Sequence, residues 1–365
     1  MKKQGGKPYH KKFSFSPWFV KEESSISCRV LKKFSDITSY FPKPLKNWIT
    51  SFSGEFLLII SRFISIFSQF SLNAYIVNGI EKTSKKEIFI LYVGDEKLCP
   101  YLSELLFVNK PKIDKEFKFR IWNYKKKIKE ISSKIDGVFI KSDRFYTRYF
   151  EKQGYTTIPE WVTIKVDISE PLEKVYSNCT NGMKEEIKKI KKYGFTYEIT
   201  EDIDKLRFFY NKMYLPYISW KYGKFGRVYN YYTIKNFFNR GCKILFIKQN
   251  DQYLFGGVFL QKDKEVITSY AGVMQGKYDR IKQGLITASY YYLIQHSKEI
   301  GANLVDFGSC RPFVKDGLYN YKRKWGALIG KSGNECAQIY SIKFLSDKNE
   351  VNTFFENNPL VPFKN

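Results

Sequence analysis

The chain reads Asn303-Leu304-Val305-Asp306-Phe307-Gly308-Ser309-Cys310-Arg311 over residues 303–311. The first five residues have the apolar pattern of a short buried strand, which ends at an acid and a glycine turn. Shortly afterwards the chain reads Leu318-Tyr319-Asn320-Tyr321-Lys322-Arg323-Lys324-Trp325-Gly326. In α/β folds, polar groups that gather where a strand ends often form a site. These two runs therefore predict a functional site at the end of the strand.

The segments before this strand carry regular helix and strand patterns. Met183, Ile187 and Ile190 fall at helical spacing with lysines on the other face, which predicts a helix over 183–193. Apolar runs separated by two tight turns predict an antiparallel three-strand meander. The elements expected here are strand 195–199, helix 202–214, an aromatic loop over 216–229, helix 234–240, strands 243–248, 253–261 and 265–273, a polar loop over 274–284 and helix 285–299.

The first half of the chain also alternates between strands and helices. We predict strands over 87–95, 137–141 and 159–167, and helices over 98–109 and 144–153, the second capped by Asp143 and ended by Gly154. This alternation indicates an α/β domain. The predicted organisation is a basic disordered tail over 1–25, a diverged α/β lobe over 26–165, a second domain over 166–346 and a C-terminal tail over 347–365.

The chain is strongly basic, with a formal net charge of +26 over 365 residues, and the excess is spread over both halves. A field of this sign favours polyanions such as nucleic acid, anionic lipid or phosphorylated carriers. The alternative is a compositional bias that coats the surface with solvated lysine, and it stays open because lysine greatly outnumbers arginine.

The cysteines and histidines do not indicate a metal site. The 6 cysteines contain no CxxC pair, and the only histidines are His10 and His296. Reduced thiols in a cytoplasmic protein are expected. The most apolar stretch, 56–67, is short and contains Arg62, so we predict a buried or amphipathic segment rather than a membrane span. No signal peptide is expected, and contact with the inner face of the membrane stays an alternative.

Three pieces of the second half resemble a known superfamily. They are the basic helix that ends at Gly194, the run Ser269–Val273 followed by Gly284 and its helix, and the strand with Asp306-Phe307-Gly308 that leads to Trp325-Gly326. In this order they resemble the GNAT acyltransferases, in the branch of the Fem-type aminoacyl transferases and the cellulose-biosynthesis (CelD-like) acyltransferases. The resemblance implies an α+β fold with a largely antiparallel mixed sheet flanked by helices, in two GNAT-like lobes.

The resemblance also implies a donor site at the start of helix 285–299. There Arg280, Lys282, Gln283 and Gly284 would bind a pyrophosphate, which a helix N-terminus and a glycine favour. The chain departs from the Q/RxxGxG pattern of CoA-binding members because it has one glycine here. The implied co-substrate is therefore acyl-CoA or another activated donor, on an acyl carrier protein or a tRNA, with no tightly bound cofactor. An ordinary glycine turn is the alternative.

The implied reaction is attack of an amine on an activated acyl group. It needs a base, donors for the carbonyl oxygen, and orientation. We expect Asp306 to act as the base or to orient substrate, with a turn-capping role as the alternative. Tyr319 and Tyr321 are the candidates to protonate a leaving group. The candidate substrate-binding residues are Trp220, Tyr270, Arg311, Lys322 and Trp325. The alternatives are a lobe interface for Trp220, a solvated surface charge for Arg311 and Lys322, and core packing for Trp325.

Two further expectations concern reactivity and partners. Cys310 has no histidine near it in sequence, so a nucleophilic role is not expected. The implied acceptor is an amine-bearing small molecule, sugar or peptide. A different class of function stays open, namely a non-catalytic basic module that binds nucleic acid or an anionic membrane or envelope surface.

Overall fold

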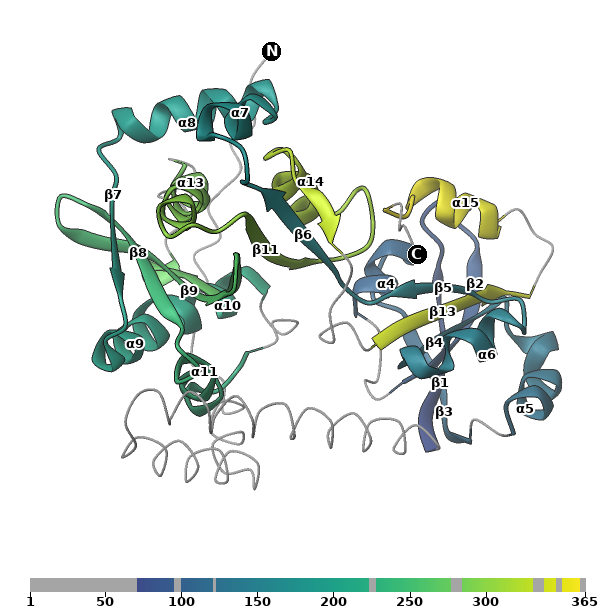
Figure 1. The fold of residues 1–365 in the computed structure, drawn as a ribbon. Helices are drawn as coiled ribbons and strands as arrows, with labels where there is room; N and C mark the ends of the chain where they lie inside the picture. Colours follow the sequence, from purple (N-terminus) through teal and green to yellow (C-terminus); the bar gives the residue numbers. More distant parts are fainter. Residues whose placement is uncertain are drawn as a thin grey trace, which may run out of the picture.

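The protein folds into two lobes, each built on its own β-sheet (Figure 1). The computed structural model describes residues 71–94, 100–120, 123–222, 228–276, 284–330, 338–345 and 350–361. Both sheets are mixed and largely antiparallel, and helices flank them, which confirms the predicted fold class. In the described part of the chain no helix is long and apolar enough to cross a membrane. The predicted tail over 1–25 and the apolar stretch over 56–67 lie outside the described residues.

The first sheet has six strands and a buried cluster on each face. Neighbouring strands pair antiparallel except for β2 and β4, which are parallel. In sheet order its strands are β3 (Lys112–Arg120), β1 (Ser71–Ile80), β2 (Glu87–Val93), β4 (Gly137–Asp143), β13 (Gln338–Phe344) and β5 (Thr156–Pro159). The helices of this lobe are α4 (Pro100–Leu106), α5 (Tyr124–Ile131), α6 (Thr147–Glu151) and α15 (Glu350–Asn357).

The end of the chain returns to this first sheet. Strand β13 lies between β4 and β5, and Phe354 of α15 packs in the same core as Tyr340 of β13. The sequence placed residues up to 346 in the second half, but strand pairing puts β13 in the first lobe. The domain boundaries themselves stay a prediction. Between β4 and α6, the carboxylate of Asp143 accepts a hydrogen bond from the N–H of Phe145, so Asp143 caps this turn as expected.

The second sheet has seven strands and contains the predicted meander. Strands β8, β9 and β10 pair antiparallel in succession, and Asn250 and Asp251 adopt positive φ in the turn between β8 and β9. In sheet order the strands are β12 (Leu328–Gly330), β6 (Val162–Asp167), β11 (Leu304–Cys310), β10 (Glu265–Val273), β9 (Gln252–Lys262), β8 (Lys243–Gln249) and β7 (Thr196–Thr200).

Helices cover both faces of this sheet. α8 (Asn181–Lys192) and α13 (Leu285–Glu299) pack on one face, and the π-helical segment Tyr210–Tyr214 with α11 (Tyr231–Phe238) packs on the other. Close approach requires glycine at residue 272, because a Cβ there would lie 2.4 Å from the backbone nitrogen of Tyr214. The remaining helices are α7 (Leu172–Ser177), α9 (Ile203–Phe209), α10 (Leu215–Tyr222) and α14 (Gly317–Arg323).

One sequence prediction fails in this layer. The aromatic stretch over 216–229 was expected to be a loop, but its first part is the helix α10. The rings explain the difference, because Tyr217 packs into the core beneath α10 and helical spacing carries Trp220 beside it, with ring centroids 6.1 Å apart.

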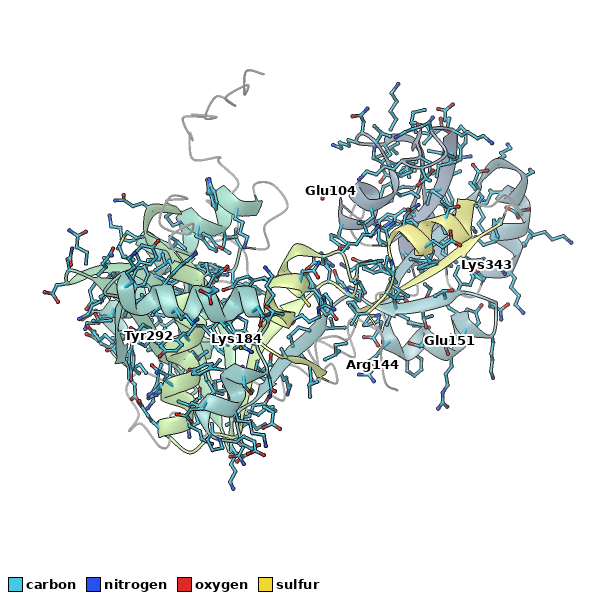
Figure 2. All side chains as sticks on the ribbon, turned by 90° about the horizontal axis from the view of Figure 1, so that it is seen from above. Glu104, Arg144, Glu151, Lys184, Tyr292 and Lys343 are labelled. Atoms are coloured by element: carbon cyan, nitrogen blue, oxygen red, sulfur yellow. The ribbon has the colours of Figure 1, made fainter. Side chains whose placement is uncertain are left out.

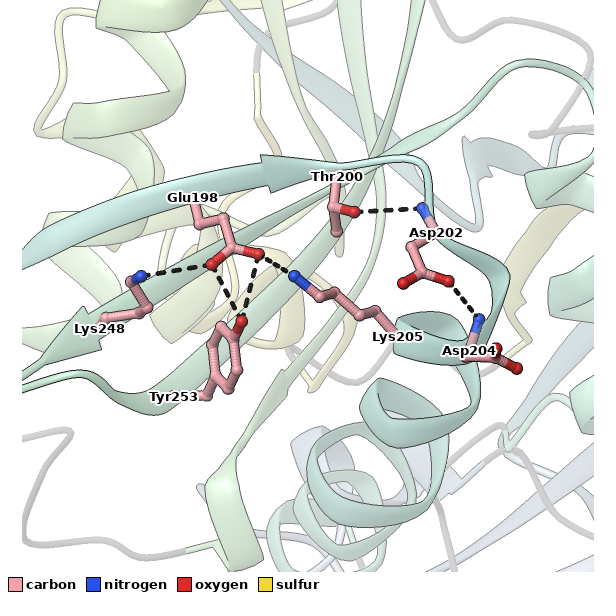
Figure 3. Close-up of polar contacts among 7 residues, drawn as sticks. All are labelled: Glu198, Thr200, Asp202, Asp204, Lys205, Lys248 and Tyr253. Carbon is pink, nitrogen blue, oxygen red and sulfur yellow. Dashed lines mark hydrogen bonds and ion pairs between the residues drawn. The ribbon is translucent and has the colours of Figure 1, made fainter.

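The outer strand β7 is joined to its neighbours by one carboxylate (Figure 3). Glu198 accepts hydrogen bonds from Lys205 of α9, from Lys248 of β8 at 3.3 Å, and from the hydroxyl of Tyr253 of β9 at 2.9 Å. These contacts connect three elements beside β7. They fix the outer edge of the second lobe. Figure 2 shows both lobes from above, with Lys184 and Tyr292 on the second lobe and Glu151 and Lys343 on the first.

Candidate functional site

The two parallel strands of the second sheet separate early. β10 and β11 pair only from Glu265↔Leu304 to Ile267↔Asp306. Beyond that point β10 continues to Val273, whereas β11 shifts register against β6 between Asp306 and Ser309. The sequence predicted a strand over 303–307 that ends at the acid and the glycine turn, but β11 continues to Cys310. Asp306 therefore lies at a bulge inside the strand and not at its end.

The bulge depends on a glycine and on the carboxylate before it. Gly308 has φ +77°, a left-handed conformation that side-chain-bearing residues rarely adopt. Its N–H donates to Oδ1 of Asp306 at 2.7 Å, and the hydroxyl of Thr268 on β10 donates to the carbonyl of Asp306 at 3.0 Å. The Asp306 side chain thus closes the bulge locally, as an Asx-type cap does.

Asp306 is 5% exposed as a residue, and charged groups lie near its carboxyl. Its Oδ2 lies 3.8 Å from Nζ of Lys165, which also pairs with Glu265. Burial raises the pKa of Asp306 above the ordinary value of 3.8, against the lowering effects of the Gly308 N–H and of Lys165. This combination of burial and a partly compensated charge is typical of carboxyls at functional sites, although structural networks also produce it.

Lys322 closes the bulge from the other side. It extends from α14, is 3% exposed, and its Nζ donates to the carbonyls of Gly308 and Ser309, each at 2.9 Å. Burial lowers the pKa of Lys322 to about 8. In this conformation its donors point to the backbone of β11. These contacts give Lys322 a role in holding the strand, and its role in binding substrate stays a prediction.

Tyr321 lies on the opposite side of α14 from the buried cluster around Cys310, and it contacts the helix layer. Its hydroxyl lies 3.0 Å from Oγ1 of Thr287, in the first turn of α13, and Thr287 donates to Oε2 of Glu186 on α8 at 2.6 Å. Burial raises the pKa of the Tyr321 hydroxyl, so it is protonated at neutral pH. Three helices therefore meet at one chain of hydroxyl and carboxylate groups.

Aromatic rings surround this contact. The ring of Tyr290 on α13 lies 4.2 Å from that of Phe307, 5.9 Å from that of Tyr321 and 6.0 Å from that of Trp325, measured between centroids. Trp325 is 1% exposed, so it belongs to the core beside the site, which is the packing alternative weighed for it. The Tyr321 side chain is therefore buried next to aromatic rings.

The proposed donor loop is described only at its last residue. Gly284 precedes α13 with φ +83°, and nothing lies within 4 Å of a Cβ built there. Arg280, Lys282 and Gln283 lie outside the described residues. Because β10 and β11 are parallel and α13 connects them, the start of α13 lies at the carboxyl ends of both strands, where they separate.

Arg311 lies at the junction of the two lobes. Its guanidinium carbon lies 3.7 Å from the ring centroid of Trp161 and 4.9 Å from that of Tyr101. It also donates to a carboxylate oxygen of Glu160 at 3.3 Å and to the hydroxyl of Tyr340 at 3.4 Å. Residues 160 and 161 connect β5 of the first sheet to β6 of the second, so Arg311 joins the lobes at the crossing of the chain (Figure 1).

Three other predicted residues lie apart from the Asp306–Tyr321 group. Tyr319 packs in a separate cluster with Val162, Ile164, Cys310 and Val361. Tyr270 lies in the aromatic layer over β10, with its ring 5.8 Å from that of Tyr214. Trp220 is 37% exposed on α10. Cys310 is fully buried, in the same cluster as Tyr319.

Sequence reasoning missed Thr287, Glu186 and Lys165. Thr287 had a detectable signal, since it is a polar residue at a position that the helical period of 285–299 turns toward the core. Glu186 gave no such signal, because it is one of several charges on a lysine-rich helix. Its partner lies 101 positions further along the chain, and no local pattern connects them.

Comparison with known proteins finds weak structural similarity only. No protein-family model matches the sequence, and no curated protein matches it. FemX is 12% identical, with a TM-score of 0.40 over 73% of this chain and 83% of its own. The L-PGS of Bacillus licheniformis is 13% identical, with a TM-score of 0.35 over 75% of this chain and 86% of its own.

A GCN5-related N-acetyltransferase from Anabaena variabilis is 10% identical, with a TM-score of 0.32 over 75% of this chain and 59% of its own. At such low TM-scores and identities these similarities decide nothing about function. The function of this protein is therefore inferred from its own strands and side chains.

Proposed function

We propose that this protein is an N-acyltransferase that transfers an acyl or aminoacyl group from an activated donor to an amine. The observation that carries the proposal is the early separation of β10 from β11. Within the described part of the chain, no strand pairs with that edge of β10 beyond Ile267. A strand edge of this kind can bond an extended ligand through its N–H and C=O groups.

The chemical groups of the proposed donors match the gap that opens between β10 and β11 beyond Ile267. The pantetheine arm of an acyl-CoA or acyl carrier is an extended chain with amide groups, which matches the backbone edge of β10 beyond Ile267. Phosphates on such a donor, or on an aminoacyl-tRNA, are favoured at the start of α13 by the helix dipole and by the free N–H groups of its first turn. Arg280 and Lys282 are proposed to add positive charge there, with Gln283 and Gly284 beside them.

The chemistry is direct attack and needs no enzyme nucleophile. The amine nitrogen bonds to the acyl carbon, and the bond from that carbon to the leaving group breaks with its electron pair. Tyr321 is the proposed catalytic residue, since its hydroxyl is buried against Thr287 in the first turn of α13, the helix that connects β10 to β11. Asp306 and Lys322 are proposed as positioning residues, because they hold Gly308 and set where β11 leaves β10.

The acceptor is proposed to enter past α10. Tyr217 of this helix is in the same core as Tyr290 and Tyr321, and Lys221 donates to its hydroxyl at 3.0 Å. Trp220 stacks beside Tyr217 and is partly exposed. Rings next to cations suit an amine-bearing small molecule, sugar or peptide with a planar or apolar face.

The test is a transfer assay with purified protein. Acyl-CoA, acyl-carrier and aminoacyl-tRNA donors are each mixed with a panel of amines, and amide products are measured by mass spectrometry. We expect product from one donor class and a loss of about 100-fold or more in kcat for Tyr321→Phe. The control is Tyr319→Phe, a buried tyrosine of the same helix in a different cluster. Absence of donor binding and of product for every class contradicts the proposal.

A further inference from the structure

Glu186, Thr287 and Tyr321 form a continuous hydrogen-bonded chain between three helices. Thr287 is 2% exposed and lies between the other two, 2.6 Å from Glu186 and 3.0 Å from Tyr321. Glu186 is only partly buried, so its carboxylate connects the chain to solvent. The three residues come from α8, α13 and α14, which are far apart in sequence.

The positions of the protons in this chain follow from counting donors. An ionised carboxylate only accepts, and a threonine hydroxyl has one proton. Thr287 donates that proton to Glu186, so the contact between Tyr321 and Thr287 is one in which the Tyr321 hydroxyl donates. The Tyr321 oxygen has two lone pairs, and the indole N–H of Trp325 faces one of them, so the other can accept a hydrogen bond from a bound amine.

Other hydroxyl side chains of α13 bond differently from Thr287. Ser289 and Ser297 of the same helix donate to backbone carbonyls, of Ile286 at 2.7 Å and of Leu293 at 2.6 Å. Helical serine and threonine commonly bond in this way. Thr287 instead donates across to another helix, and its oxygen accepts from a third.

We propose that Thr287 and Glu186 carry the proton of the attacking amine away from the reacting centre through Tyr321. The inference rests on the acyl transfer proposed above. As the nitrogen–carbon bond forms, the amine proton passes to the Tyr321 oxygen, the Tyr321 proton passes to Thr287, and the Thr287 proton passes to Glu186. The leaving group departs with the electron pair of its bond to the acyl carbon, and Glu186 releases the proton to water.

The properties of Tyr321, Thr287 and Glu186 are consistent with these proton transfers. The burial that raises the pKa of Tyr321 keeps a phenolate from accumulating, so a concerted shift of protons is favoured over free ionisation. Thr287 touches no substrate in this arrangement and acts through Tyr321. Thr287 and Glu186 are therefore positioning residues for proton transfer, and Tyr321 is the residue that touches the amine.

The experiment compares four variants with the wild-type protein, using the donor and amine that the wild type accepts. Glu186→Gln keeps the shape of the side chain but removes the carboxylate that takes up the proton. Thr287→Val removes the hydroxyl. We expect both to lower kcat by about 100-fold while KM stays within about twofold. Thr287→Ser restores the hydroxyl and is expected to recover most of the rate. The matched control is Glu185→Gln, the exposed neighbour of Glu186, which pairs with Lys188 on the surface.

The outcomes test the proton relay, defined as the path through Tyr321, Thr287 and Glu186, separately from the transferase function that it serves. Wild-type kcat in Glu186→Gln and Thr287→Val overturns the relay but leaves the transferase intact. The relay is also overturned if Thr287→Ser is as slow as Thr287→Val, or if the loss appears in KM alone. A wild-type protein that binds no donor and forms no product overturns the proposed function and the relay with it. Glu186→Gln keeps the relay testable where Thr287→Val does not fold.

Discussion

The ammonium of Lys322 lies 2.9 Å from the carbonyl oxygen of Gly308, so a buried cation from α14 holds the bulge at which β11 leaves β10. The same glycine is held from its other side by the carboxylate of Asp306. Asp306 and Lys322, which have side chains of opposite charge, thereby hold Gly308 in its left-handed backbone conformation. The geometry of the gap between the strands depends on this arrangement.

Lys322 is expected to make stability depend on alkaline pH. Its pKa is lowered from 10.5 to about 8 in the folded protein, so between these values the unfolded chain binds more protons. The free energy of unfolding therefore rises with pH across this window, by about 3 kcal/mol in total at 1.4 kcal/mol per pKa unit. Denaturant titrations from pH 7 to 10.5 measure the slope. Lys322→Met should lose it, whereas Lys324→Met, an exposed neighbour, should keep it. Parallel slopes for all three proteins contradict the assignment.

Asp306 is expected to act in the opposite sense at acidic pH. Its folded pKa is raised above 3.8, so the folded protein binds more protons than the unfolded chain just above that value. Stability should fall as the pH rises through this window. Asp306→Asn keeps an oxygen that accepts from the Gly308 N–H, and it should gain stability relative to the wild type between pH 4 and pH 7. Urea titrations at several pH values test this, and a constant difference between the two proteins counts against it.

Gly308→Ala is expected to destabilise the second lobe by about 1–2 kcal/mol. The left-handed backbone strains any residue with a Cβ, and the new atom would lie 3.3 Å from Oγ1 of Thr268. The control is Gly182→Ala at the start of α8, where nothing lies within 4 Å and helix propensity favours alanine. Equal midpoints for the two variants in urea unfolding would falsify the claim that the bulge needs glycine.

Arg311→Lys is expected to weaken the junction between the lobes by about 1–3 kcal/mol. Lysine keeps the charge but loses the planar stacking on Trp161 and the hydrogen bonds from Nη1 to Glu160 and Tyr340. Hydrogen exchange should speed up in residues 160–161 and in α4 more than in the meander. Arg323→Lys, on the exposed face of α14, is the control. Unchanged exchange at the junction in Arg311→Lys contradicts a joining role.

The sequence by itself determined the elements whose signals are local. Helix 285–299 has the bounds that its periodicity and flanking glycines predicted, and the meander of β8, β9 and β10 follows from apolar runs between tight turns. These signals suffice because a helix or hairpin is specified by residues within a few positions of each other. The concentration of polar groups around Asp306 and Tyr321 was visible for the same reason.

Tertiary structure alone decided which of those groups meet. Strand β13 pairs with β4 of the first sheet across some two hundred residues of chain, and Thr287 reaches a carboxylate on a different helix. Lys322 turned out to hold backbone carbonyls, and Arg311 turned out to join the lobes, because the direction of a side chain is set by the packing of its element and not by its neighbours in sequence. Strand register and helix packing, which depend on the whole core, are what convert a run of polar residues into a site.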